Sequence, residues 1–397
     1  MAMVLQLSTF VTQYLTASAH EIKDKSPTAL RFGVLSTAMI NPAAIIHPSE
    51  THGDVLLYGV ASREYNKARS YAKKYGFSKA YGSYEELLND ADVDAVYIPL
   101  PNGMHAEWAI KSLEKGKHVL LEKPLTANAD EAKHVFKAAK KAGKVCLEAF
   151  HWRFHPAAHV VDALLSSGRY GPVLSTHSRM TTPKGSVPKN NIRWKYELAG
   201  GSLMDMSYTI SSTRYFLHMP RLEAVNSAAA VPAPHDSRVD AAMNAELTFK
   251  SELAPNPVKA SIYTDMDRAN SYVLIPRVWE LPSIQIECEN ATIYFYNFMM
   301  PHLYHYIAIT DKKTGHTSYQ KHYSFGPKWG TRGESWWSTY RYQLEAFVDK
   351  VRGREPVCWI EPEDSVMQME CIDSVYEKSG LGKRKGTSEL LREKEKK

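Results

Sequence analysis

Between residues 30 and 150, short apolar runs alternate with segments in which apolar residues recur at helical spacing. The apolar runs predict strands at residues 30–35, 55–61, 93–98, 118–121 and 144–149. The segments between them predict helices at residues 64–75, 103–115 and 129–142. This alternation predicts a doubly wound α/β fold of the Rossmann type, in which helices cover both faces of a parallel sheet.

The pattern changes after about residue 155. A helix at 156–168 is followed by a strand, a glycine-rich turn and a helix at 208–217. Alternating strands then dominate, at residues 223–229, 245–249, 259–264, 283–288, 291–296 and 304–310. Helices at 340–352 and 362–378 close the pattern. We therefore expect a second, α+β domain with an open and mostly antiparallel sheet.

A chain of 397 residues is long enough for two domains. The expected parts are an N-terminal extension (1–29), the Rossmann domain (30–152), the α+β domain (153–381) and a polar tail (382–397). The tail carries a run of charges that is typical of a frayed terminus. The extension has apolar residues at the spacing of a short amphipathic helix, namely Leu5, Phe10, Val11 and Leu15.

Composition narrows the possible partners. The net charge of +6 is mild for this length, and no basic stripe interleaved with aromatic residues predicts nucleic-acid binding. No apolar run approaches the ~18 residues of a membrane span, and residues 1–20 lack the pattern of a signal peptide. The cysteines lie far apart, at positions 146, 288, 358 and 371, which is typical of a reducing compartment. We therefore expect a cytoplasmic protein.

Lys123 follows the apolar run 119–121, in the sequence Glu122-Lys123-Pro124. Proline fixes its own φ and restricts the residue before it, so Lys123 is held at the end of a buried strand. In a doubly wound sheet the ligand crevice lies outside the carboxyl ends of the strands. Partial burial there can tune a lysine for acid–base chemistry. Lys123 is therefore a catalytic candidate, the alternative being a solvated lysine that caps a strand.

The first predicted strand leads into a turn that would approach a pyrophosphate in a dinucleotide-binding fold. The turn lacks the pattern Gly-x-Gly-x-x-Gly, because Ser36 and Ala38 occupy the first two glycine positions. Small side chains still permit close approach, and Ser36 or Thr37 can hydrogen-bond a phosphate. We therefore expect cofactor contacts from Ser36, Thr37, Ala38, Met39 and Ile40.

The second strand ends in Ser62 and Arg63, with Lys67 one helical turn later. An NAD site would place a carboxylate here for the ribose 2′-hydroxyl, whereas serine and arginine suit a 2′-phosphate. The sequence therefore favours NADP over NAD. Further cofactor candidates follow the next buried strand, namely Pro101, Asn102 and His105. Asn102 also suits a helix cap, and His105 has a structural alternative.

Four groups of residues resemble one known family. They are Pro101-Asn102-x-x-His105, Glu122-Lys123-Pro124, Glu148-Ala149-Phe150 with Arg153-Phe154-x-Pro156, and Gly200-Gly201-x-Leu203-x-Asp205-x-x-Tyr208. In kind and order they are similar to the glucose–fructose oxidoreductase/inositol dehydrogenase/MocA (Gfo/Idh/MocA) oxidoreductases. The nearest branch looks like the NADP-dependent D-xylose 1-dehydrogenases and dimeric dihydrodiol dehydrogenases. The chain departs from the family in the turn at Ser36 and in Ser207, where many members have glycine.

This resemblance implies a Rossmann domain, a nicotinamide cofactor, an open-sheet domain that often pairs two copies, and a sugar, polyol or diol substrate. Hydride transfer to the cofactor leaves the substrate hydroxyl to be deprotonated by the protein. We expect Tyr208 to be the acid/base, Lys123 to be its electrostatic partner and a substrate hydrogen-bond donor, and Asp205 to orient them or bind substrate hydroxyls. A nearby ammonium is expected to lower the pKa of Tyr208 by favouring the phenolate.

Other residues beside these motifs are candidates with structural alternatives. Glu122 and Arg153 would contact the cofactor, and His151 and Trp152 would contact the substrate. Histidine pairs at helical spacing raise the possibility of a metal, but metal sites need three or four converging ligands, so none is expected. Two rival functions stay open: an NADP-binding regulator without turnover, and an NAD-dependent glycosidase of the same family.

Overall fold

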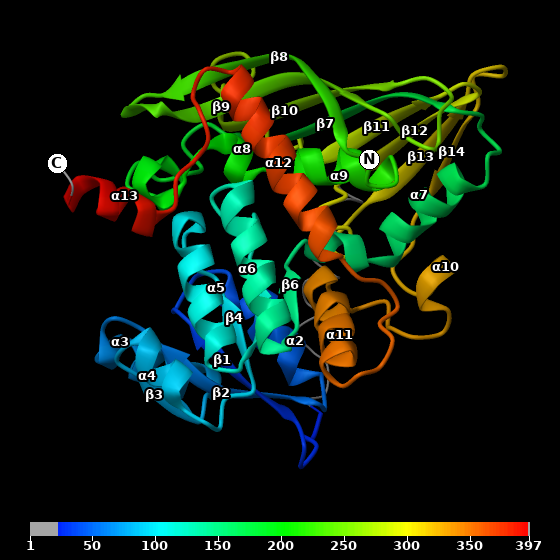
Figure 1. The fold of residues 1–397 in the computed structure, drawn as a ribbon. Coiled ribbons are helices and arrows are strands. Elements are labelled where there is room, and N and C mark those ends of the chain that lie inside the picture. The colour runs from blue at the N-terminus through cyan, green and yellow to red at the C-terminus, as the bar shows by residue number, and fades with distance from the viewer. Residues whose placement is uncertain (1–22, 396–397) are drawn as a thin grey trace.

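The computed structural model describes residues 23–395 as two β-sheets joined and covered by helices (Figure 1). The first sheet is parallel and has the strand order β3-β2-β1-β4-β5-β6. Its strands are β1 (Leu30–Leu35), β2 (Val55–Ala61), β3 (Lys79–Tyr81), β4 (Ala95–Ile98), β5 (His118–Leu121) and β6 (Cys146–Glu148). The order reverses between β1 and β4, which is the point where a Rossmann sheet binds its ligand.

Helices α2 (His47–Glu50), α3 (Tyr65–Tyr75), α4 (Tyr84–Asn89), α5 (His105–Glu114) and α6 (Ala129–Ala142) connect these strands. Local chemistry sets their ends. Gly76 ends α3 with φ of 75°, a left-handed conformation that glycine adopts at no steric cost. The side chain of Asn128 accepts a hydrogen bond from the Glu131 amide and begins α6.

The second sheet has eight strands in the order β14-β13-β12-β11-β7-β10-β9-β8. They are β7 (Val173–Pro183), β8 (Leu222–Ala233), β9 (Asp236–Phe249), β10 (Val258–Arg268), β11 (Ser283–Cys288), β12 (Ala291–Tyr296), β13 (Tyr306–Asp311) and β14 (Thr317–Gln320). Only the pair β7 and β10 is parallel. The predicted fold class is therefore confirmed, although the short strands β3 and β14 were not predicted from the sequence.

Helices pack on one face of this sheet. Helices α8 (Ser202–Asp205), α9 (Tyr208–Phe216) and α12 (Pro362–Lys378) contact its strands from the side that faces the Rossmann sheet (Figure 1). Helix α7 (Pro156–Ser166) lies beside α9 and α10 (Gly326–Trp329). The cavity described below lies between this helical layer and the Rossmann sheet.

The last part of the chain returns to the first sheet. In α11 (Thr339–Val351), Phe347 packs on Phe32 of β1 with ring centroids 5.8 Å apart. The expectation of a frayed polar tail is wrong, because Thr387–Glu395 forms α13 and Arg384 is wholly buried. Arg384 pairs with buried Asp240 at 2.8 Å, a contact that a charge pattern cannot reveal.

Part of the chain lies outside this description. The amphipathic helix predicted around Leu5 to Leu15 falls outside the described residues. Within residues 23–395, no helix is both long and apolar enough to cross a membrane.

Candidate active site

A cavity of about 500 Å³ lies between the carboxyl ends of the Rossmann strands and the helical layer of the second sheet. Residues of both halves of the chain line it. From the first half these are Ala38, Met39, Ile40, Pro99, Leu100, Pro101, Asn102, Glu122 and Lys123. From the second half they are Met180, Asn191, Ile192, Arg193, Leu198, Gly200, Asp205, Tyr208, Met299, Met300 and Tyr340. The cavity therefore collects nine of the residues predicted for the site.

The turn after β1 keeps a glycine-like backbone although it lacks glycine. Ser36 has φ of 144°, which L-residues rarely adopt. Its hydroxyl accepts the Ala38 amide at 3.2 Å, and Asn41 donates to its carbonyl oxygen at 2.9 Å. Ala38, Met39 and Ile40 reach the cavity, with Met39 almost fully exposed at its rim. Ser36 and Thr37 stand behind them and do not line it.

The residues predicted to bind a 2′-phosphate lie at the end of β2, outside the cavity lining. Ser62 is buried and accepts the Glu64 amide at 3.3 Å. Arg63 and Lys67 are exposed, and neither forms an ion pair with any residue of the described part of the chain. Both side chains are therefore available to an anion beside β1.

The end of β4 provides one residue that joins the two halves of the site. The side-chain amide of Asn102 donates to the Ala199 carbonyl at 3.2 Å, and no side-chain cap bond forms at this helix start. His105 is wholly buried, with its ring nitrogens 2.9 and 2.7 Å from the carbonyl oxygens of Pro124 and Leu100. The structure therefore gives His105 a bracing role under the Lys123 turn instead of the predicted cofactor contact.

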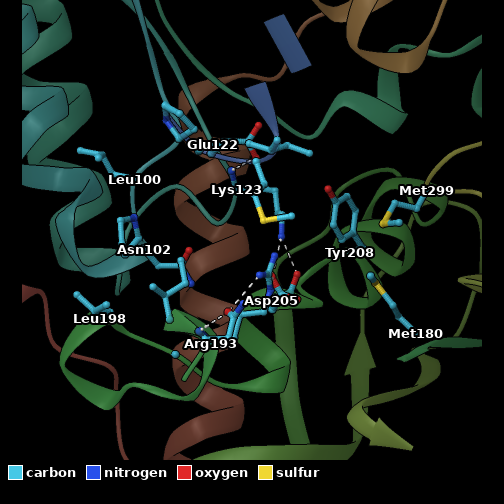
Figure 2. Close-up of a pocket in the computed structure, with 18 of the residues that line it drawn as sticks. Leu100, Asn102, Glu122, Lys123, Met180, Arg193, Leu198, Asp205, Tyr208 and Met299 are labelled. Atoms are coloured by element: carbon cyan, nitrogen blue, oxygen red, sulfur yellow. Dashed lines mark hydrogen bonds and ion pairs between the residues drawn. The ribbon is translucent and has the colours of Figure 1, made fainter. Parts of the chain in front are cut away.

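Lys123 extends from the end of β5 to residues of the helical layer (Figure 2). Its ammonium donates to the Asp205 carbonyl oxygen at 2.7 Å and lies 3.5 Å from the Asp205 carboxylate. The same ammonium lies 4.9 Å from the centroid of the Tyr208 ring. The structure therefore brings together the three residues expected to act on the substrate.

Asp205 is shared between two cations. The guanidinium of Arg193 lies 2.8 Å from the carboxylate oxygen that also faces Lys123. Burial opposes ionisation, but Lys123 and Arg193 outweigh it and hold the pKa of Asp205 below its usual value. Asp205 is therefore ionised at neutral pH.

Tyr208 is only 4% exposed, and its hydroxyl lies 2.9 Å from Nε2 of His151. Burial, together with Tyr340 and Glu122, raises the pKa of the phenol well above its usual value. The expectation that Lys123 lowers this pKa is wrong. Lys123 faces the ring and makes no hydrogen bond to the phenol oxygen, so burial dominates.

Two glycines before Asp205 let the backbone pack closely against its neighbours. Gly201 has φ of 140°, and a Cβ there would lie 2.2 Å from a carboxylate oxygen of Asp240. A Cβ on Gly200 would lie 2.4 Å from the Arg193 carbonyl oxygen. Ser207, by contrast, has φ of −54° and fits an ordinary helical conformation without glycine.

Three further predicted contact residues do not line the cavity, whereas Glu122 does. Glu122 also accepts the Tyr97 hydroxyl at 2.6 Å. Arg153 does not line the cavity, because buried Asp364 holds it at 2.6 Å. Trp152 is wholly buried among aromatic rings, and His151 lies behind Tyr208. His151, Trp152 and Arg153 therefore lie outside the cavity lining.

Several lining residues were not found from the sequence. Arg193 lies in a short 3-10 helix (Ile192–Trp194) whose sequence showed no motif, although basic residues cluster around it. Tyr340 at the start of α11 stacks on His151 with centroids 3.9 Å apart. Met180, Met299 and Met300 come from a strand and a loop of the second sheet. Only tertiary folding brings these residues to the cavity. Within residues 23–395, no three metal-ligating side chains gather as a metal would require.

The Rossmann sheet has a cavity at its switch point, and a second sheet domain closes this cavity. This arrangement is typical of proteins that bind a dinucleotide. The family model "Oxidoreductase family, NAD-binding Rossmann fold" matches residues 30–150, and the Gfo/Idh/MocA C-terminal domain matches residues 159–294. The chain is 33% identical to D-xylose 1-dehydrogenase (NADP(+)) 2 of Haloferax volcanii over 89% of its own length and 98% of the relative. The protein therefore belongs to the Gfo/Idh/MocA family and is an oxidoreductase.

Other relatives match over part of their length. Trans-1,2-dihydrobenzene-1,2-diol dehydrogenase of Xenopus laevis is 30% identical over 56% of this chain and 67% of the relative. Among solved structures, a 3-ketoreductase of Actinomadura kijaniata in complex with TDP-benzene and NADP is 25% identical, with a TM-score of 0.72 over 88% of this chain and 97% of that chain. An aldose–aldose oxidoreductase of Caulobacter crescentus shares the fold, at 20% identity and a TM-score of 0.72 over 89% of this chain and 98% of that chain.

One buried carboxyl group beneath the site predicts a pH effect on stability. Glu148 is wholly buried and accepts the Leu125 amide at 2.8 Å. Burial raises the pKa of Glu148 to about 7, above that of an unfolded glutamic acid (about 4.3). The folded state therefore binds more protons between those two pH values, and the free energy of unfolding falls as pH rises through that range.

We expect Glu148→Gln to keep a hydrogen-bond acceptor for the Leu125 amide. The variant should no longer lose stability as pH rises. Its free energy of unfolding at pH 8 should exceed that of the wild type by about 1–3 kcal/mol, with little gain at pH 5. Exposed Glu114→Gln is the matched control and should show no such pH dependence. Chemical unfolding at both pH values measures the difference, and an equal effect at pH 5 and pH 8 would contradict the assignment.

Proposed function

We propose that the protein is an NADP-dependent oxidoreductase that transfers hydride between the nicotinamide and a hydroxyl-bearing carbon of a sugar, polyol or diol. The observation that carries this proposal is the meeting of Lys123, Asp205 and Tyr208 at the carboxyl end of β5, beside the switch point of the Rossmann sheet. An ammonium and a phenol facing one cavity are the groups needed to bind and deprotonate a hydroxyl.

The residues around β1 fit a dinucleotide. The glycine-like φ of Ser36 and the small side chain of Ala38 leave the backbone of the turn open to a pyrophosphate. Arg63 and Lys67, unpaired within the described residues, suit a 2′-phosphate. The relative from Haloferax volcanii is named for NADP(+), which supports the same preference.

The cofactor supplies the hydride acceptor or donor at its nicotinamide ring. Lys123 donates a hydrogen bond to the reacting oxygen and stabilises its negative charge, while Asp205 pairs with Lys123 and fixes its position. The Tyr208 oxygen takes the hydroxyl proton in oxidation and returns it in reduction. Glu122, whose pKa burial raises, holds the cavity wall through its bond to Tyr97.

The lining suits a small carbon skeleton that carries several hydroxyls. Met180, Met299 and Met300 give adaptable apolar walls, and Arg193 and Asn102 add polar groups opposite them. Relatives named for D-xylose and for a trans-dihydrodiol make these the first compounds to assay.

A substrate panel decides between this function and its two rivals. Aldoses, inositols and trans-dihydrodiols are assayed with NADP and with NAD. Each assay measures both the reduced cofactor and the oxidised product. Stoichiometric NADPH formation supports the proposal. Tight NADP binding without turnover on any compound would favour a regulator, and glycoside cleavage without net cofactor reduction would favour a glycosidase.

Replacing Tyr208 by phenylalanine removes only the hydroxyl that handles the proton. We expect Tyr208→Phe to lower turnover by at least ~10²-fold, the scale of a lost acid–base group, while the Kd for NADP stays unchanged. Tyr215→Phe is the matched control, because Tyr215 is a buried tyrosine on the same helix whose hydroxyl has no partner in the described chain. Wild-type turnover in the Tyr208 variant would remove this residue from the mechanism.

Replacing Arg63 by alanine removes the guanidinium at the end of β2. We expect Arg63→Ala to raise the KM for NADP by at least ~10-fold, because the variant loses roughly one charge-assisted hydrogen bond to the 2′-phosphate. The KM for NAD should stay nearly unchanged. Exposed Arg69→Ala, two turns along the same segment, is the control. Equal changes for both cofactors would place the 2′-phosphate elsewhere.

We also propose that two copies pair through the face of the second sheet that carries no helices (Figure 1). Tyrosines gather there on neighbouring strands, namely Tyr294, Tyr296, Tyr304, Tyr306 and Tyr319. Their half-buried and exposed rings offer a broad aromatic surface of the kind that is enriched in interfaces. Sedimentation velocity at micromolar concentration tests this pairing, and a monomer would contradict it.

A further inference from the structure

The hydroxyl of Tyr208 begins a line of hydrogen bonds that leads away from the cavity. His151 lies 2.9 Å from the phenol oxygen through Nε2, and its Nδ1 lies 2.8 Å from Oγ1 of Thr339. That same Oγ1 lies 3.3 Å from Nδ1 of His302. His151 and Thr339 are buried, whereas His302 is partly exposed. The line therefore leads from the cavity to a partly exposed histidine.

One backbone donor fixes the direction of every bond in this line. The Thr339 amide, at the start of α11, donates to Nδ1 of His302 at 3.4 Å, so that nitrogen carries no proton and the proton of His302 is on Nε2. The Thr339 hydroxyl therefore also donates to Nδ1 of His302 and accepts from Nδ1 of His151. Nε2 of His151 then carries no proton and accepts a hydrogen bond from the Tyr208 hydroxyl.

This arrangement prepares Tyr208 to act as a base. Its own proton points towards His151, so a lone pair of its oxygen faces the cavity. Burial, with His302 and Lys123, lowers the pKa of His151 well below its usual value, and burial with His305 lowers that of His302 to about 3. Both imidazoles are therefore neutral, which is the state that can accept a proton on one nitrogen and release one from the other.

We propose that Tyr208, His151, Thr339 and His302 form a proton relay that carries the substrate hydroxyl proton from the cavity to solvent, a role that rests on the proposed dehydrogenase function. His151, Thr339 and His302 act through Tyr208 and do not touch the substrate. The relay explains how a phenol with a raised pKa serves as a base: it gains one proton as it gives up another.

The proton balance in oxidation is complete. The substrate O–H bond breaks as a new bond forms to the Tyr208 oxygen, and the former phenol proton moves to Nε2 of His151. The Nδ1 proton of His151 passes to Thr339, whose own hydroxyl proton passes to Nδ1 of His302. His302 releases its Nε2 proton to water. The C–H electron pair leaves with the hydride to the cofactor.

Thr339→Val tests the relay, because it removes the hydroxyl and keeps both the size of the side chain and the amide that contacts His302. We expect turnover to fall by at least ~10-fold and the solvent deuterium isotope effect on kcat to rise above that of the wild type, with the Kd for NADP unchanged. Thr339→Ser restores the hydroxyl and should recover most of the turnover. Thr213→Val, a buried threonine of α9 outside the relay, is the control. Wild-type turnover and isotope effect in Thr339→Val would overturn the proposal.

A second measurement does not depend on catalysis. Nitrogen-15 NMR of histidine-labelled protein, assigned with His151→Phe and His302→Gln, should show His302 as the Nε2–H tautomer and His151 as the Nδ1–H tautomer. The opposite tautomer at either histidine would overturn the relay even in an active enzyme. If the protein shows the expected tautomers but turns over no compound of the panel, the dehydrogenase function and the relay are both refuted. The line of hydrogen bonds would then remain as a structural feature.

Discussion

The contact between Lys123 and Asp205 is the interaction on which the rest of the site depends. Lys123 follows a buried strand of the Rossmann sheet, and Asp205 ends a short helix under the second sheet. A partly buried cation needs a partner, and Lys123 finds one across the junction of the two sheets. Arg193 shares the same carboxylate, so two cations lie beside the reacting groups. That charge suits a reaction in which an alkoxide develops.

Both partners of this contact are braced from below by buried groups. On one side, Glu148 holds the Leu125 amide and His105 holds the Pro124 carbonyl, which fixes the turn after Lys123. On the other side, Asp240 accepts the Leu203 amide at 2.8 Å at the start of α8, and Arg384 pairs with Asp240. The segment after α12 thus contributes to the geometry of the site, because it supplies a buried cation that the charge of Asp240 requires.

Sequence patterns predicted the local features well. The bounds of β5, α6 and α12 follow from apolar spacing and capping residues, and the apolar run before Glu122-Lys123-Pro124 places a lysine at a strand end. The contribution of the second half to the cavity was only partly predictable. Arg193 and Tyr340 lie in segments whose position is set by long-range packing, and the pKa of Tyr208 is set by burial, which a motif does not show. Arg153 was predicted from a motif to contact the cofactor, but it forms a buried ion pair with Asp364.

The most direct test of the account is a crystal structure of the protein with NADP and an unreactive substrate analogue. The account predicts that the analogue's hydroxyl lies within hydrogen-bond distance of both the Tyr208 oxygen and the Lys123 ammonium, with its carbon facing the nicotinamide ring. A cofactor bound away from β1 and β4, or a hydroxyl that contacts neither residue, would contradict it.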